Sequence, residues 1–321
     1  MRRSRTTLIA TVATALALAA CGGERQDAAS GEGGRLSIAT GNTTGVYYQM
    51  GGGLARLIGQ NLPGYTATAE ATGASVENIR RVVNGDSDIA FTLADTAGDA
   101  AQGKGSFTSP QPIRALARIY TNYTQVLVRS DAGITSVEQM KGKTVSTGSP
   151  NSGTEVIAER LHTAAGVDPA AGIKRQKLSL PETVQGMKDG TIQAMFWSGG
   201  LPTAGVTDLV TSLKGQVRFL DLTPYLSELQ SRYGQVYQPA EVAPAVYKQS
   251  APVRTIGVPN MLVVKDSMSD DLAFKLTQLL FTKQAELVKV HPEAKNITRE
   301  LATKTDPVQL HPGAQRYFDG S

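Results

Sequence analysis

Four short segments rich in glycine and small polar side chains carry chemistry that could bind a small molecule. They are residues 40–48, 71–75, 149–154 and 196–202. Glycine allows a ligand to approach the backbone closely, and free N–H groups at the start of a helix attract an anion. Each segment alone could also be an ordinary turn before a capped helix. Together the four segments predict a cleft that binds a small anionic or zwitterionic molecule.

The candidate binding residues lie in these segments, except Asn78, which lies one helical turn after the second segment, and Asp95, which lies just past the end of the strand at 88–93. We expect backbone N–H groups and hydroxyls at residues 43–47 and 151–154 to hold a ligand carboxylate, because two helices begin there. Asn78 would add a hydrogen bond, Asp95 would pair with an ammonium group, and Trp197 would pack against the ligand. The complete candidate set is Thr43, Thr44, Tyr47, Ser75, Asn78, Asp95, Asn151, Ser152, Thr154, Trp197, Gly199 and Gly200.

Several of these residues have a plain structural alternative. Ser75 could be an N-cap, Asp95 could cap the helix that follows it, and Tyr47 could pack inward. Ser152 and Glu155 have the spacing of a capping box, which explains Ser152 without any ligand.

Catalytic and metal-binding motifs are poorly supported. His162, His291 and His311 are the only histidines, and they form neither an HExxH pair nor a Cys/His set. The chain contains no G-x-S-x-G elbow and no GxxxxGK[ST] loop. A hydrolase that uses Ser and Lys is compatible with the residue types, but no spacing suggests it. We therefore expect a binding protein rather than an enzyme, with no cofactor and no metal.

The N-terminal segment has the three parts of a secretory signal. Residues 1–20 have three arginines among the first five positions, continue through an apolar stretch at 8–18, and end in small residues. Cys21, the only cysteine, follows directly, and the sequence before it resembles the bacterial lipobox. We expect Cys21 to be lipidated and residues 21–33 to form a flexible tether, so that the protein is anchored outside the cytoplasmic membrane. An ordinary signal followed by an incidental cysteine is the alternative.

The composition excludes several other classes of protein. The chain has 321 residues, of which 40% are hydrophobic and 19% charged, unlike a disordered protein. A single cysteine excludes a disulfide scaffold. The net charge of +4 includes the three N-terminal arginines, and without them 29 Lys and Arg face 28 Asp and Glu. The mature chain therefore lacks the basic excess of a nucleic-acid-binding protein, and we expect a monomer that binds no nucleic acid.

Strands and helices alternate along the rest of the chain, which predicts α/β lobes with mostly parallel sheets. Residues 239–252 show little periodicity and are expected to be a connection. We expect strands at residues 35–39, 65–72, 88–93, 113–120, 124–129, 143–147, 176–180, 195–197 and 255–264. We expect helices from residue 46, at 75–84, from 152 to 165, ending at 190, at 270–290 and at 292–302.

Two lobes with a ligand cleft between them follow from this order. Ligands of open α/β sheets bind beyond the C-terminal ends of the strands. We expect the lobes to close by bending at residues 123–126 and 255–258. The expected segments are a lipoprotein signal peptide (1–20), a tether (21–33), lobe 1 (34–125), lobe 2 (126–254), and a return to lobe 1 with C-terminal helices (255–321).

Ordered motifs give the chain a family resemblance from about residue 36 to 318. The motifs are Gly-x-Tyr-Tyr at 45–48, Thr-Gly-Ala-Ser-Val-Glu-Asn at 72–78, Gly85 with Asp88, Ser-Gly-Thr at 152–154, Phe-Trp-x-Gly-Gly-x-Pro at 196–202, and His-Pro-Gly-Ala at 311–314. With these motifs the chain resembles a TAXI-type solute-binding protein of the TRAP transporters, although residues 49–51 and 92–95 depart from the family pattern.

The resemblance implies a two-lobe, type II-like periplasmic-binding-protein fold and a transport function. It implies an extracytoplasmic receptor that captures a small carboxylate or an amino acid similar to glutamate or glutamine. The partner would be a TRAP permease driven by an ion gradient. Three alternatives remain: the solute-binding lipoprotein of an ABC transporter, a lipoprotein that senses a ligand without transport, and a secreted enzyme.

Overall fold

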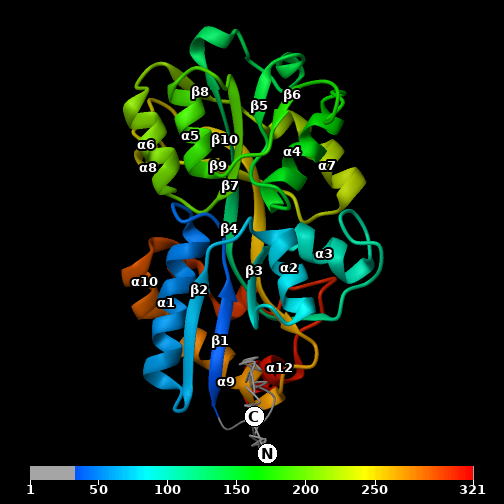
Figure 1. Cartoon of the computed structure of the whole chain (residues 1–321), viewed down its shortest axis with the longest axis vertical. Coiled ribbons are helices and arrows are strands. Elements are labelled where there is room, and N and C mark those ends of the chain that lie inside the picture. The colour runs from blue at the N-terminus through cyan, green and yellow to red at the C-terminus, as the bar shows by residue number, and fades with distance from the viewer. Residues whose placement is uncertain (1–32, 321) are drawn as a thin grey trace, which may run out of the picture.

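The computed structural model describes residues 33–320, which form an α/β protein with two lobes, one above the other in Figure 1. Its strands belong to a single mixed sheet in the order β2-β1-β3-β10-β4-β7-β5-β6, with β8 added to β4 and β9 added to β10. The expected two-lobe α/β fold is confirmed. The signal segment and Cys21 lie outside the described residues. No helix within residues 33–320 is both long and apolar enough to cross a membrane.

The lower lobe contains the N-terminal elements and the C-terminal helices (Figure 1). Within it, β1 pairs with β2 and β3 in parallel, as the βαβαβ order predicts. Its elements are β1 (Gly34–Ala39), α1 (Val46–Asn61), β2 (Tyr65–Glu70), α2 (Ser75–Asn84), β3 (Ile89–Leu93), α3 (Ala94–Gln102), α9 (Asp270–Thr282), α10 (Gln284–Val290), the 3-10 turn η5 (Pro292–Asn296), α11 (Arg299–Ala302) and α12 (Pro312–Asp319).

The upper lobe contains the central part of the chain. Here β5 pairs in parallel with β6 and β7. Its elements are η2 (Ser130–Ala132), η3 (Glu138–Met140), β5 (Thr144–Ser146), α4 (Gly153–Ala164), β6 (Lys174–Gln176), α5 (Leu180–Lys188), β7 (Ala194–Gly199), α6 (Ala204–Ser212), β8 (Val217–Phe219), η4 (Thr223–Tyr225), α7 (Leu226–Tyr233), β9 (Gln238–Val242) and α8 (Pro244–Tyr247).

Two long strands, β4 (Ile113–Arg129) and β10 (Val253–Lys265), run through both lobes (Figure 1). They pair with each other in antiparallel fashion from Ile113 with Lys265 up to Tyr123 with Gly257. Above that point the two strands separate, because β4 pairs with β7 while β10 pairs with β9. The two strands expected at 113–120 and 124–129 are thus one strand. The expected hinge segments fall where the pairing partner changes, and bending there stays a prediction.

Local sequence signals explain several helix boundaries. Gly85 ends α2 with φ of 80°, a left-handed conformation that glycine adopts without steric cost. The Ser152 side chain caps α4 by accepting a hydrogen bond from the Glu155 N–H, as expected. The Glu155 carboxylate, however, accepts from the Asn151 N–H, so the capping box is only half formed. Ser179 and Glu182 form a complete capping box at α5.

The C-terminal third differs from expectation in three places. Residues 239–252 contain most of β9 and all of α8, because β9 gains a partner in β10 that local periodicity does not reveal. The helix expected at 270–290 divides into α9 and α10 at Lys283. The helix expected at 292–302 is a 3-10 turn followed by the short α11.

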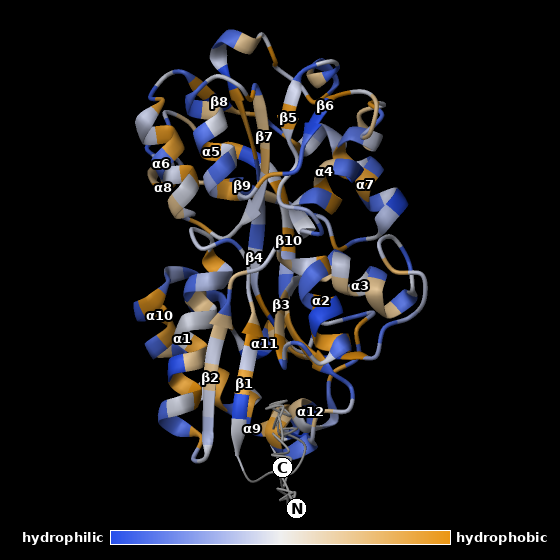
Figure 2. Ribbon diagram, viewed as in Figure 1, coloured by the Kyte–Doolittle hydropathy of each residue, from blue (hydrophilic) through white to orange (hydrophobic). Residues whose placement is uncertain are grey.

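Helices cover both faces of the sheet in each lobe, and apolar residues lie between the layers. In the lower lobe α1 and α9 pack on one face, and α2 and α3 pack on the other. In the upper lobe α4 and α7 lie opposite α5 and α6. Figure 2 shows mixed hydrophilic and hydrophobic residues along the outer helices. The lobe boundaries at residues 125 and 254 stay a prediction.

Candidate functional site

A cavity lies between the lobes, where three helices begin. It holds about 440 Å³ of space, part of it open to solvent, and residues of both lobes form its wall. The lining residues are Gly41, Asn42, Gly45, Val46, Tyr47, Gly73, Ala74, Ser75, Leu93, Asn122, Ser149, Ser152, Gly153, Thr154, Trp197, Ser198, Gly199 and Gly200. All four segments singled out in the sequence therefore contribute to one cavity.

The N-termini of α1, α2 and α4 supply the positive potential of the cavity. Gly45 and Ala74 precede α1 and α2 without any side-chain cap, so the first N–H groups of these helices lack intrahelical acceptors. In α4 the first intrahelical hydrogen bond joins the Val156 N–H to the Ser152 carbonyl. Each helix start carries about half a positive charge. None of the residues lining the cavity carries a formal charge, so this site suits an anionic group held by backbone and hydroxyls.

Two hydroxyl groups in the upper lobe are available to a ligand. The Ser198 N–H donates a hydrogen bond to the Thr154 Oγ1 over 3.1 Å, which uses an acceptor position of this oxygen. The Thr154 hydroxyl proton therefore remains to be donated. The Ser198 Oγ is buried and has no hydrogen-bond partner within residues 33–320. Buried hydroxyls are normally paired, so an unpaired one in the cavity wall indicates a ligand contact.

A buried chain of amides fixes the lower wall. The Tyr47 hydroxyl donates to the Asn260 Oδ1, and the Asn260 Nδ2 donates to the Asn122 Oδ1 over 2.9 Å. The Asn122 Nδ2 in turn donates to the Ser198 carbonyl over 3.3 Å. Burial raises the pKa of Tyr47, which keeps the phenol neutral. The Tyr47 proton is thus committed to Asn260, and Tyr47 can only accept a hydrogen bond from a ligand.

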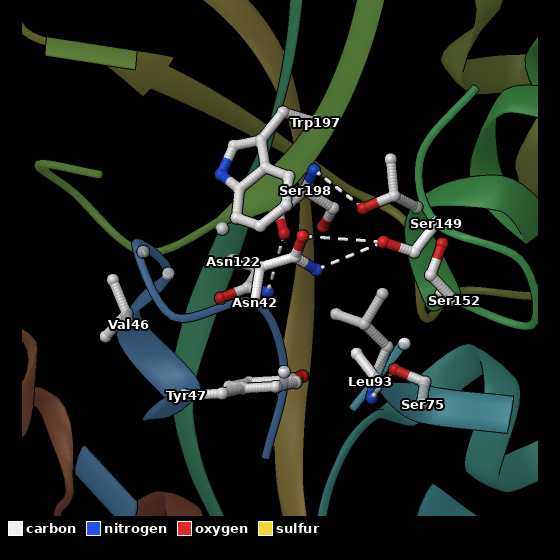
Figure 3. Close-up of a pocket in the computed structure, with 18 residues that line it drawn as sticks. Asn42, Val46, Tyr47, Ser75, Leu93, Asn122, Ser149, Ser152, Trp197 and Ser198 are labelled. Atoms are coloured by element: carbon white, nitrogen blue, oxygen red, sulfur yellow. Dashed lines mark hydrogen bonds between the residues drawn. The ribbon is translucent and has the colours of Figure 1, made fainter. Parts of the chain in front are cut away.

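Aromatic rings lie on opposite sides of the cavity. Figure 3 shows the Tyr47 ring below the space and the Trp197 indole above it. The indole N–H of Trp197 donates to the Thr203 hydroxyl over 3.0 Å, so the ring offers the ligand its apolar surface. A side chain on Gly45 would lie 3.4 Å from the indole and 3.1 Å from the Asn42 carbonyl. Glycine at this position therefore lets the start of α1 approach the tryptophan.

Asn42 joins the two lobes at the edge of the cavity (Figure 3). Its Nδ2 donates to the Ser149 Oγ over 3.2 Å, and its Oδ1 accepts from the Leu180 N–H over 2.7 Å. Sequence reasoning missed Asn42, Asn122 and Asn260. Asn42 had a signal because it lies within the segment 40–48, directly before the candidate Thr43, and Asn260 was a lone amide within an apolar strand. Asn122 gave no signal, because it was expected to lie between two strands.

Seven of the candidate residues line the cavity: Tyr47, Ser75, Ser152, Thr154, Trp197, Gly199 and Gly200. Two others, Thr43 and Asn151, line a neighbouring surface groove instead. Ser75 is held in place because its Oγ accepts the Leu93 N–H over 3.1 Å. Asn78 is fully buried away from the cavity, and its Nδ2 donates to the carbonyls of Thr40 and Phe91. Asn78 thus joins the ends of β1 and β3, a structural role.

Two further candidates, Thr44 and Asp95, also lie outside the cavity. The Thr44 Oγ1 is buried without a partner in the described part of the chain and lies near Gly205 of α6. The structure does not place Asp95 where it could meet a ligand ammonium group. Its carboxylate accepts from the Thr96 N–H, but Asp95 lies within the first turn of α3, whose N-cap position is Leu93, so it is not the helix cap that was the alternative.

Asp95 belongs to a buried cluster of four residues that joins the lobes, here called the inter-lobe cluster: Asp95 and Asp99 of α3, Arg160 of α4, and Tyr237. The Arg160 Nη1 lies 3.4 Å from the Asp95 Oδ2, and its Nη2 forms an ion pair with Asp99. The Tyr237 hydroxyl donates to the Asp95 Oδ2 over 2.6 Å. The Asp95 side chain is fully buried. This cluster stabilises the contact between α3 of the lower lobe and α4 of the upper lobe, outside the cavity described above.

Residues 33–320 contain no group of three or more His, Cys, Asp or Glu side chains arranged to hold a metal ion. Burial lowers the pKa of His162, His291 and His311, which keeps these imidazoles neutral. His291 caps η5 and His311 caps α12 through their Nδ1 atoms, which accept from the Glu293 and Gly313 N–H groups respectively. His291 and His311 therefore have structural roles as N-caps.

Solved structures with low sequence identity share the fold of this chain. A binding-protein component of an ABC phosphonate transporter from Pseudomonas aeruginosa matches with a TM-score of 0.56 and 15% identity, covering 82% of this chain and 79% of that one. MatC from Rhodopseudomonas palustris, solved with bound malate, matches with a TM-score of 0.56 and 13% identity, covering 89% and 97%. At these identities the likeness shows the fold. The family model described as NMT1-like family matches residues 38–320.

Proposed function

The chain belongs to the NMT1-like family, and we propose that it is an extracytoplasmic solute-binding protein that holds a small carboxylate between its two lobes. The observation that carries this proposal is the convergence of three helix N-termini on a cavity whose lining has no charged side chain. Such a wall compensates a negative charge without an arginine, because the backbone N–H groups of each helix start carry partial positive charge.

The ligand carboxylate lies against the start of α4 in this proposal. There the Thr154 hydroxyl and the N–H groups of Gly153 and Thr154 donate, and the unpaired Ser198 hydroxyl adds a further contact. Trp197 covers the apolar part of the ligand. No acidic side chain lines the cavity, and Asp95, which lies outside it, is paired with Arg160 and Tyr237, so none is placed to meet an ammonium group. A simple carboxylate therefore fits the site better than an amino acid such as glutamate or glutamine, which would need backbone carbonyls for its ammonium group.

A TRAP-type permease driven by an ion gradient is the proposed partner, on the basis of the TAXI-like motifs. Lipidation of Cys21 would hold the protein at the outer side of the membrane. An ABC transporter is the second candidate, because a similar structure is a component of one. Genes for a TRAP permease beside the gene for this chain would support the first partner, and genes for ATP-binding-cassette subunits would support the second.

A thermal-shift screen followed by calorimetry tests the binding function. A ligand that binds only the native state raises the melting temperature, so a panel of mono- and dicarboxylates and amino acids identifies the class. The affinity of the best compound is then measured for Thr154→Val and Ser198→Ala. A hydrogen bond to a charged group contributes about 1.5–3 kcal/mol, so each variant should bind roughly tenfold to a hundredfold more weakly.

Thr277→Val is the matched control. Thr277 is a buried threonine of α9 whose hydroxyl donates to the Ala273 carbonyl over 2.8 Å, far from the cavity in the lower lobe. Its loss should lower stability and leave ligand affinity unchanged. If Thr154→Val and Ser198→Ala bind as tightly as Thr277→Val, the carboxylate is not held at the start of α4. If no carboxylate or amino acid raises the melting temperature, the proposed ligand class is wrong.

A further inference from the structure

A second cavity lies between the lobes and shares no lining residue with the first. It holds about 1720 Å³ of space, much of it open to solvent. Its walls come from α3 of the lower lobe, from α4 and the chain after α7 in the upper lobe, and from both long strands. Figure 1 shows α3 beneath α4 and α7 on the same side of the molecule. The inter-lobe cluster forms part of this wall.

Basic side chains outnumber acidic ones around this cavity. Five cations line it, namely Lys104, Arg118, Arg160, Arg232 and Lys304. The three acidic residues are Asp95, Asp99 and Asp306, of which the first two are paired with Arg160. Arg232 is paired with Glu228 outside the cavity. Because Arg160 neutralises only one of its two aspartates, two negative charges remain against the three positive charges of Arg118, Lys104 and Lys304, an excess of one positive charge.

Arg118 is the decisive residue, because it has no counter-ion in the described part of the chain. Its Nε is buried without a hydrogen-bond partner, and no ion pair to Arg118 occurs within residues 33–320. Burial alone lowers the pKa of Arg118, and no neighbouring carboxylate opposes this effect. A partly buried guanidinium is costly when it is unpaired. Its planar fork of N–H donors matches the oxygens of a carboxylate, sulfate or phosphate.

We propose that the second cavity binds a small multiply charged oxyanion through Arg118, with Lys104 and Lys304 adding long-range attraction. The anion lies between elements of both lobes, beside the inter-lobe cluster, and is distinct from the solute in the first cavity. This proposal does not depend on the identity of that solute, since no residue is shared between the two cavities.

Calorimetry with inorganic sulfate and inorganic phosphate tests the site on the full chain. Arg118→Met removes the unpaired charge and keeps the length of the side chain. Arg114→Met is the matched control, because Arg114 lies on the same strand, bonds to Gln309, and does not line the cavity. We expect Arg118→Met to weaken oxyanion binding at least about tenfold and Arg114→Met to leave it within about twofold.

Stability separates a binding defect from a folding defect. Because Arg118 is an unpaired cation, Arg118→Met should melt at the same temperature as wild type or higher in buffer without oxyanions. Arg118→Lys keeps the charge without the fork, so it should bind with intermediate affinity. Equal sulfate and phosphate affinities in Arg118→Met, Arg114→Met and wild type would overturn the proposal. Absence of any measurable binding to wild type would overturn it as well.

Discussion

Removal of the Arg160 guanidinium should open the cleft without unfolding either lobe. In Arg160→Met the Asp95 carboxylate keeps the Tyr237 hydroxyl and the Thr96 N–H but loses its cation, and its side chain is fully buried. Breaking one side of a buried ion pair costs about 3–5 kcal/mol. Because two hydrogen bonds remain, we expect the lower end of that range.

The loss destabilises the closed arrangement of the lobes relative to the open one, because the ion pairs join α4 of the upper lobe to α3 of the lower lobe. Opening the cleft brings water to Asp95 and relieves the penalty. About 3 kcal/mol changes the ratio of closed to open molecules by roughly a hundredfold. If the closed form binds the solute, the apparent affinity falls by up to that factor once the open form dominates. Calorimetry measures the affinity, and solution scattering measures the radius of gyration of the unliganded protein.

Arg175→Met is the matched control for this experiment. Arg175 of β6 forms ion pairs with Glu155 and Glu159, all within the upper lobe, and its side chain is about as buried as that of Arg160 (14% against 10% exposed). Its loss should lower the stability of the upper lobe and leave closure unchanged. Equal radii of gyration and equal solute affinities in Arg160→Met and Arg175→Met would refute the reasoning.

Three further predictions follow from the described contacts and from the N-terminal sequence. Gly153→Ala should weaken solute binding and increase the radius of gyration measured by scattering, because the new Cβ would lie 2.4 Å from the Leu93 Cδ1 across the cleft. Gly52→Ala is the control: its new Cβ would meet nothing within 4 Å, so this variant should behave as wild type. Burial lowers the pKa of His162, so its folded pKa lies below its unfolded value and wild type loses stability as the pH falls below about 6.5. Urea unfolding at neutral and acidic pH should show a smaller loss in His162→Phe, by at most about 1.4 kcal/mol per pH unit, and identical losses would contradict this assignment. Cys21→Ser should release the protein from the membrane fraction, and equal labelling of both proteins by a fatty-acid probe would show that Cys21 is not the anchor.

Local signals in the sequence were sufficient for many elements and for the glycine-rich loops of the site. The helix at 75–84 was predicted with its observed bounds, because its apolar residues share one face and Gly85 ends it. The starts of α1 and α4 were placed correctly for similar reasons, and both reach the cavity. At these helix starts, the glycines and small polar residues that mark the beginning of the helix also line the cavity, so one sequence signal predicted both.

Long-range partners explain what the sequence could not predict. Two strands were expected, on either side of Asn122, yet β4 continues through it because β10 and then β7 satisfy its backbone. Asp95 was assigned to a ligand because Arg160 and Tyr237, its actual partners, lie far along the chain. Tyr47 was expected to donate to a ligand, but its proton goes to Asn260. In each case the competing partner belongs to another element, and only the assembled sheet brings it close.

The position of β10 in the sheet also has a consequence for the order of folding. β3 ends at Leu93, which pairs with Asn260, so the lower sheet is complete only when the chain has returned to it near its C-terminal end. Loop-closure entropy must be overcome before such distant contacts contribute, and a high contact order slows folding. The upper lobe, formed largely by the intervening chain, can assemble from more local contacts. We therefore expect amides of the upper-lobe strands to gain protection from hydrogen exchange before those of β3 during refolding.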